Sequence, residues 1–205
     1  MTFTGFTQED FDTFLISGLE ERMEAIEERI RPKFRIIGQA VTDDLSMELN
    51  QEMFLHIARH ARRTVNPPQD TWLAVANNKR GYKKHPHFQI GLFDDHLFIW
   101  LAFIYELPNK AQIAQNFLDH IDTLEEKIPA DYVISGDHMK KPATSMKEID
   151  LEKALTRFRD VKKAEFLVGR HIATDDPILQ NPEAFMETVK ETFHTLIPLY
   201  QLAYQ

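Results

Sequence analysis

Residues 77–87 gather the basic side chains and imidazoles that could hold an anion. The segment reads Asn-Asn-Lys-Arg-Gly-Tyr-Lys-Lys-His-Pro-His, and no acidic residue occurs between Asp70 and Asp94. Gly81 can adopt a positive φ and let the chain turn tightly, while Arg and Lys suit phosphate or carboxylate. The segment predicts an anion-binding loop, although a solvated connection that discourages edge pairing would have the same composition. The cations concerned are Lys79, Arg80, Lys83 and Lys84.

Two histidines end this segment. If the chain is extended there, His85 and His87 point to one side, and Asp137 or His138 from a later loop could join them around a metal. No ligand spacing supports that join, and Pro86 disturbs the strand. We therefore predict polar histidines at the entry of a strand and no metal site.

A second polar loop, residues 136–145, follows a short expected strand. Asp137 could orient His138 as a general base, or Lys140 and Lys141 could join the first basic loop around one ligand. An ordinary polar turn is the alternative.

Arg170 is unusual because it lies in an expected strand with the same parity as Phe166 and Val168. Its side chain should then point inward, where a guanidinium needs a partner. A structural ion pair and an anion-binding Arg in a cleft are both consistent with this position.

Composition excludes several classes of function. The chain has 205 residues, 24 Lys and Arg against 32 Asp and Glu, a net charge of −8 and no Cys. Disulfides, thiolate nucleophiles and Cys-bound metals are excluded, and an acidic chain disfavours binding to bulk DNA or anionic membrane. The longest apolar run, Leu97–Tyr105, is too short to span a bilayer. No signal peptide is visible, so we expect a cytoplasmic protein. GxGxxG, P-loop, GxSxG and HExxH motifs are missing, and no cofactor is predicted.

Periodicity predicts one α+β domain over residues 1–205, with a helical first third. Apolar residues recur at helical spacing after Thr7, and a second helix should end at Pro32. A third helix is expected around Phe34–Leu45, with a strand as the alternative. Ser46 is expected to cap a fourth helix to about Arg63, which would place His56 and His60 on one face.

The remainder predicts a mainly antiparallel sheet of about five strands flanked by several helices. A hairpin should turn at Asp94–Asp95, and its second strand is apolar throughout, which indicates a central position. Asn109, Asp150 and Asn181 are expected to cap later helices. The expected strands are 72–76, 87–93, 96–104, 132–135 and 165–172.

Several of these segments resemble the YktB-like family of Gram-positive bacteria, a family of unknown function. The resemblance rests on residues 70–72, 78–88, 98–102 and 135–138 and covers nearly the whole chain. It implies a small cytoplasmic α+β protein, with a fold loosely grouped with biotin ligases and class II synthetases. It assigns no catalytic residues, and the glycine-rich motif of biotin ligases is missing.

Three classes of function remain open. The first is a binding module for a phosphorylated or carboxylated small molecule, or a short RNA, through the basic loop. The second is an interaction or self-associating domain, and the oligomeric state is left open. The third is a hydrolase or group-transfer enzyme that uses the His and Asp side chains of two loops.

Overall fold

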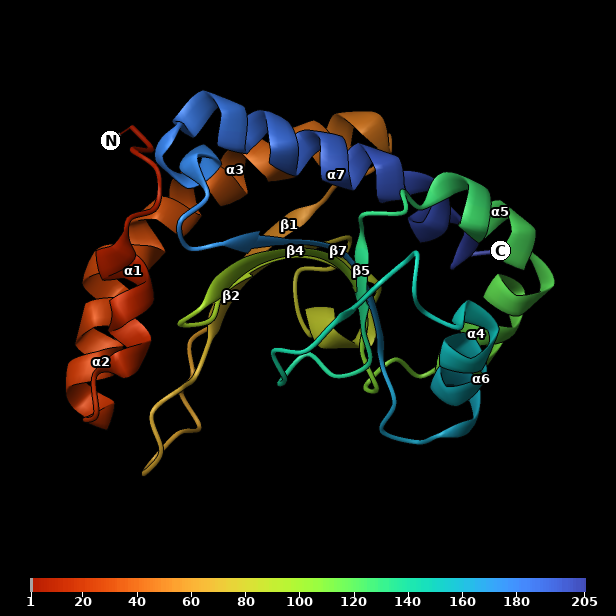
Figure 1. Ribbon diagram of the computed structural model, residues 1–205, viewed down its shortest axis with the longest axis horizontal. Helices are drawn as coiled ribbons and strands as arrows, with labels where there is room; N and C mark the ends of the chain where they lie inside the picture. The colour runs from red at the N-terminus through yellow and green to blue at the C-terminus, as the bar shows by residue number, and fades with distance from the viewer. Residues whose placement is uncertain (1) are drawn as a thin grey trace.

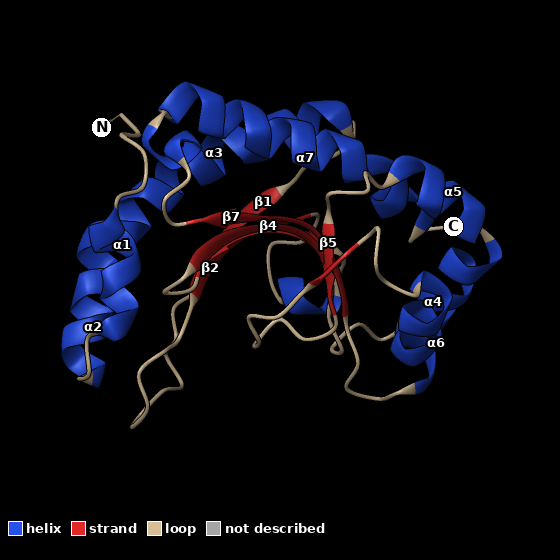
Figure 2. Cartoon of the chain, in the orientation of Figure 1, coloured by secondary structure: helices blue, strands red, loops and turns tan. Residues whose placement is uncertain are grey.

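The computed structural model describes residues 2–205, which fold into an α+β architecture around one antiparallel sheet (Figures 1 and 2). The strands follow the order β1-β2-β3-β4-β7-β5-β6, so β4 is central, as its apolar sequence predicted. The prediction of about five strands is wrong, because short strands occupy both edges of a sheet of seven. The strands are β1 (Phe54–Ile57), β2 (Thr71–Ala76), β3 (His87–Leu92), β4 (His96–Phe103), β5 (Val133–Ser135), β6 (Thr144–Ser145) and β7 (Phe166–Ala173).

Helices cover one face of this sheet and one of its ends. Figure 2 shows the two longest helices, α3 and α7, lying across the same face, with α4, α5 and α6 grouped at one end. Figure 1 shows mainly loops and a short yellow helical turn on the opposite side. The helices are α1 (Gln8–Asp12), α2 (Leu19–Ala25), α3 (Arg31–Glu48), α4 (Lys110–Asp119), α5 (Ile121–Lys127), α6 (Leu151–Asp160) and α7 (Pro182–Leu202). A π-helical segment, η2 (Ile26–Ile30), joins α2 to α3, and short 3-10 turns are η1 (Thr13–Leu15), η3 (Tyr82–Lys84) and η4 (Pro177–Gln180).

Two predicted helix boundaries in the first third are wrong. Pro32 does not end a helix: it is the second residue of α3, and the π-helical segment η2 joins α2 to α3 without a break. Ser46 lies inside α3: its hydroxyl donates to the carbonyl of Thr42 at 2.7 Å and accepts from the amide of Met53 at 3.1 Å. The expected helix over 46–63 is instead the end of α3, the edge strand β1 and a loop.

The two faces of the sheet differ in chemistry because side chains alternate along each strand. The face under α3 and α7, here called the helix face, carries apolar side chains of β2, β3 and β4: Leu73, Val75, Phe88, Ile90, Leu97, Ile99, Leu101 and Phe103. The opposite face, here called the loop face, mixes aromatic and polar side chains. Its members include Trp72, His87, Gln89, His96, Phe98, Trp100 and His171.

Candidate functional site

The basic loop folds back against β1 beside the loop face. Gly81 has φ 69°, the left-handed conformation that glycine accepts readily, and η3 follows it. The side-chain amide of Asn78 lies 3.0 Å from His85 Nε2, and the carbonyl of Asn78 lies 2.8 Å from His56 Nε2. His56 also stacks on the ring of Tyr82, with centroids 4.9 Å apart. These contacts hold the loop in one position next to the edge strand.

A pocket of about 680 Å³ lies between this loop and the chain around β1. A neighbouring hollow of about 320 Å³ shares Arg59, Tyr82 and Lys83 with it and extends to Trp72. We call the two together the basic pocket. Its first part is lined by the cations Arg59, Arg62, Lys79, Lys83 and Lys84, with Glu106 as the acidic side chain at its wall.

The cations of the basic pocket have no acidic partners among residues 2–205. Lys79 and Lys83 instead lie 5.2 Å from the ring centroids of Phe54 and Trp72, respectively. No ion pair within these residues involves Arg59, Arg62, Lys79, Lys83 or Lys84. Their positive charge is therefore not compensated by an ion pair within residues 2–205 and is available to a ligand in the pocket.

The other cations predicted for the site lie outside the pocket, and Lys140, Lys141 and Arg170 are paired. Lys140 Nζ lies 3.5 Å from an Asp137 carboxylate oxygen, and Lys141 pairs with Asp94 and Asp95 in the β3–β4 turn. Arg170 lies 4.9 Å over the ring of Tyr132 and 3.5 Å from Glu191, which fits the structural ion-pair interpretation. Arg80 is exposed on the basic loop and does not line the pocket.

Trp72 connects the basic pocket to the second loop. Its indole N–H donates to the hydroxyl of Tyr82 at 2.8 Å, and its ring meets His60 edge to face at 5.5 Å. The ring of His138 also meets Trp72 edge to face, at 6.2 Å. Part of the second loop therefore reaches the first, as the sequence suggested, but through His138 and not through its lysines.

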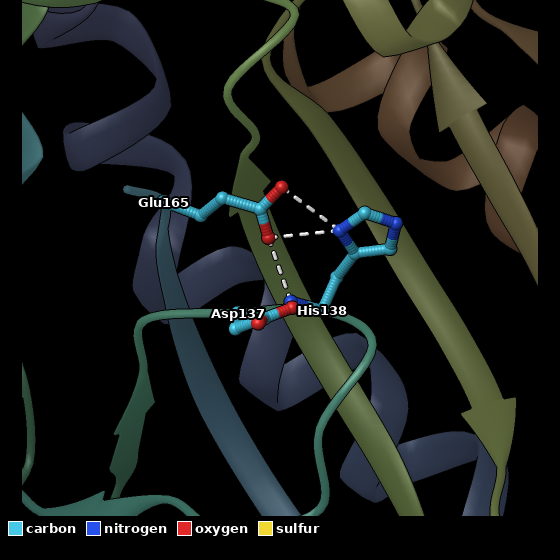
Figure 3. Close-up of side chains that lie close together, drawn as sticks. All are labelled: Asp137, His138 and Glu165. Carbon is cyan, nitrogen blue, oxygen red and sulfur yellow. Dashed lines mark hydrogen bonds and ion pairs between the residues drawn. The ribbon is translucent and has the colours of Figure 1, made fainter. Parts of the chain in front are cut away.

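Glu165, not Asp137, orients His138 (Figure 3). Glu165 immediately precedes β7 and is buried, and its two oxygens lie 2.9 and 2.8 Å from His138 Nδ1. The backbone N–H of His138 donates to the same carboxylate at 2.6 Å. Asp137 instead accepts from the backbone N–H of Met139 and pairs with Lys140. We call Glu165 and His138 the dyad.

Asp137, His138 and Glu165 each place one metal-ligating atom within 4.8 Å of the others. The hydrogen bonds of the dyad already engage both Glu165 oxygens and His138 Nδ1. A cation bound to all three side chains would have to displace the shared proton. His85 and His87 do not join this group, because they bond to Asn78 and Gln89.

Burial shifts the pKa of several groups on the loop face. It lowers the pKa of His87 to about 3 and of His60 to about 4, and the charges of Arg63, Arg31 and Lys83 add to the effect at His60. Burial also raises the pKa of Asp70 to about 6, against the charges of His138, Arg63 and Lys83. Neither carboxylate oxygen of Asp70 has a hydrogen-bond partner in the described part of the chain.

The sequence prediction missed Arg59 and Arg62 because it placed them at the end of a helix. One available signal was charge: Asp70 is the single acidic residue between Glu52 and Asp94. The basic segment therefore begins before β2 and continues into the loop that follows it. Trp72, Tyr82 and Glu165 carried no comparable signal, since their roles depend on contacts between distant segments.

Comparisons with known proteins give a family but no activity. No helix within residues 2–205 is long and apolar enough to cross a membrane. Residues 6–200 match the domain of unknown function DUF1054. A UPF0637 protein of Shouchella clausii is 63% identical over 203 residues, 99% of this chain and 96% of its own length. One from Listeria welshimeri is 52% identical over the full length of both chains. The chain therefore belongs to this family of uncharacterised proteins from Gram-positive bacteria, as its resemblance to the YktB-like family predicted.

Proposed function

We propose that the protein binds a small anionic ligand in the basic pocket. The observation that carries this proposal is the convergence of unpaired cations from two separate segments on one concavity. Arg59 and Arg62 come from the loop after β1, and Lys79, Lys83 and Lys84 from the loop after β2. In a chain of net charge −8, such a local concentration of positive charge attracts an anion.

The shape and chemistry of the pocket favour a phosphorylated ligand. Its volume of about 680 Å³ lies within the range of small-molecule sites. Two guanidinium groups can each give paired hydrogen bonds to phosphate oxygens, and the three lysines add point charges. Tyr82 supplies a half-buried ring on which an apolar or aromatic part of the ligand could pack.

Binding of inorganic phosphate and pyrophosphate, measured by calorimetry and by the rise in melting temperature, tests the proposal. The double variant Arg59→Ala, Arg62→Ala should weaken binding at least about 10-fold, because each charged hydrogen bond contributes roughly 1.5–3 kcal/mol. The control is Lys127→Ala, Lys140→Ala, which removes the same charge from side chains paired with Glu126 and Asp137.

Equal loss of affinity in the two double variants would show that only net charge matters and would contradict a built site. Absence of binding by the unaltered chain at low salt would contradict the proposal directly. Low salt is the condition most favourable to binding, because at 0.1 M salt interactions between exposed charges more than about 10 Å apart are largely screened.

A further inference from the structure

The edge strand β1 leaves part of its backbone without hydrogen-bond partners. It is the first strand of the sheet and pairs with β2 alone. One residue past its end, the N–H of Ala58 donates to the carbonyl of Trp72 at 2.9 Å. Because hydrogen-bonded residues alternate along an antiparallel pair, His56 bonds to β2 as well, whereas the N–H and C=O groups of Leu55 and Ile57 point away from it. Within residues 2–205 these four outward groups have no hydrogen-bond partner.

Side chains cap the same edge on either side of these four groups. At the start of β1, the N–H of Met53 donates to the hydroxyl of Ser46 at 3.1 Å. Beyond its end, Arg31 donates to the carbonyls of Ala58 and Arg59 at 3.1 and 3.2 Å. The open stretch between the caps has room for two hydrogen-bonded pairs with one added strand. Such an open edge is a template for pairing with another chain.

The open edge lies between two hollows of different chemistry. Leu55 and Ile57 line both the 680 Å³ part of the basic pocket and a further hollow of about 270 Å³ beside α3. The basic pocket carries the unpaired cations. In the second hollow, Arg31 and Arg35 are already paired with Glu27, and the side chains of Leu55 and Ile57 pack with the apolar core of the helix face. One side of the edge is therefore strongly basic, and the other is aliphatic and largely compensated in charge.

We propose that the open edge of β1 binds an extended acidic segment of a partner protein, which adds a strand to the sheet and places acidic side chains in the basic pocket. The proposal goes beyond a small anion but rests on the anion-binding function proposed above, because the same cations supply the charge. These cations are spread along the strand: Lys79 lies over Phe54 at the start of β1, and Arg59 follows its end. Several acidic side chains in a row match this spread.

The two hollows also predict the pattern of the segment. Side chains of an added strand alternate between the two faces of the sheet. Every second residue should therefore be acidic and point into the basic pocket. The residues between them should be aliphatic and lie beside Leu55 and Ile57 on the other face.

The backbone of the edge favours a peptide over other occupants. Its outward groups include both donors and acceptors, and a peptide backbone offers the complementary C=O and N–H groups. The phosphate groups of a nucleic acid accept hydrogen bonds but donate none, so they would leave the carbonyls of Leu55 and Ile57 unpaired. A second copy of this chain would bring its own unpaired cations against those of the first, and like charges on neighbouring strands are destabilising.

Fluorescence anisotropy of the labelled peptide acetyl-Glu-Val-Glu-Val-Glu-amide tests strand addition. One derivative is methylated on the backbone nitrogens of its Glu residues and a second on those of its Val residues. Neighbouring residues point their N–H groups to opposite edges of a strand, so only one set faces β1. Affinity should fall at least about 10-fold in one derivative, which loses two hydrogen bonds, and stay within about 2-fold in the other. Loss with the Val set indicates an antiparallel strand, and loss with the Glu set a parallel one.

Ile57→Pro removes an outward N–H from the edge without removing a bond to β2, which is the position where an edge strand tolerates proline. Ile57→Ala is the matched control, because it shortens the same side chain but keeps the N–H. Peptide affinity should be at least about 10-fold lower in the proline variant than in the alanine variant. Circular dichroism checks that both variants are folded, and the methylated peptides test the unaltered chain if the proline variant is not.

The outcomes separate this proposal from the anion-binding function. If inorganic phosphate binds but the peptide does not, strand addition fails and the anion-binding function stands; if phosphate does not bind either, both fail. Equal affinities of the two methylated derivatives would reduce the interaction to charge alone and overturn strand addition. Tighter binding of tetrauridylate, whose three phosphates match the charge of the peptide, would assign the edge to nucleic acid. A dimer in light scattering that Ile57→Pro abolishes would assign it to a second copy.

Discussion

The two faces of the sheet are built from the same strands and differ in what covers them. On the helix face, Phe88 packs against Phe193 and Tyr200 of α7, and the apolar surface is continuous. On the loop face, His87 and Gln89 of the same strand bond to each other, and Trp72 contacts two histidines. Helices bury one set of alternating side chains, whereas loops cover the other.

The helix face therefore contributes mainly to stability, whereas the loop face carries the side chains that could do chemistry. An apolar interface between helices and sheet is stabilised by burial alone. Buried imidazoles and carboxylates lose hydration, so they cost stability unless they are hydrogen-bonded or paired. Groups with such shifted pKa values cluster at functional sites. The carboxylate of Asp70 lies on this face without a hydrogen-bond partner in the described part of the chain and carries such a cost, whereas the neutral His87 is hydrogen-bonded to the carbonyl of His85 and to Gln89. The loop face is therefore where a function would be expected.

The largest effects are expected from large-to-small substitutions, which should lower the free energy of unfolding by different amounts on the two faces. Phe88 is fully buried, and Phe88→Ala should lower the free energy of unfolding by about 3–5 kcal/mol. Phe98 is 3% exposed and packs against Phe93 and Trp100. Phe98→Ala should cost less, toward the lower end of that range at about 3 kcal/mol, because covering loops can settle into the cavity more easily than helices. Urea denaturation of both variants measures the difference, and equal costs would remove the distinction between the faces.

Much of the fold follows from local sequence. The hairpin of β3 and β4 was expected from apolar strands flanking Asp94–Asp95, and the start of α7 from Asn181, whose side chain accepts from the amide of Ala184. The fourth helix was wrong because Ser46 resembles a cap in sequence but bonds back to Thr42. β1 was missed because a short, half-buried edge strand has no strong periodicity.

The site was harder to predict because its members meet through pairing of distant strands. β5 lies beside β7, which brings His138 and Glu165 together across 27 positions of sequence. Sequence proximity favoured Asp137 as the partner of His138, but neighbouring residues in a turn point in different directions. The basic loop itself was recognisable, since its charge needs no knowledge of pairing.

Asp70→Asn should stabilise the protein at neutral pH, because it removes the free energy cost of a buried carboxylate on the loop face. The folded pKa of about 6 lies above the ordinary aspartate pKa of 3.8, so the folded state retains a proton that the unfolded chain releases between these values. Stability should fall as pH rises from about 4 to 6 and then level, with a total loss on the order of 3 kcal/mol. The variant should match the unaltered chain near pH 4 and exceed it by about 2–3 kcal/mol at pH 7.

The pH dependence of the difference in unfolding free energy is the measurement, because contributions from other titrating groups cancel in it. A difference that stays constant from pH 4 to 7 would mean that Asp70 is not charged in a buried setting. A lower stability of the variant at pH 7 would show that the carboxylate has a stabilising partner in solution.

Lys141→Ala should have the smallest effect, and it tests whether the loop that carries Lys141 belongs to the ligand site. Lys141 lies on the second polar loop, residues 136–145, but pairs with Asp94 and Asp95, so its charge is already compensated. We expect a stability change below about 1 kcal/mol, as for other partly exposed pairs, and phosphate affinity within about 2-fold of the unaltered chain. A loss as large as that of Arg59→Ala, Arg62→Ala would mean that both loops gather around one ligand after all. The ligand would then bridge the β3–β4 turn and the basic pocket, and the loop face would act as a single continuous site.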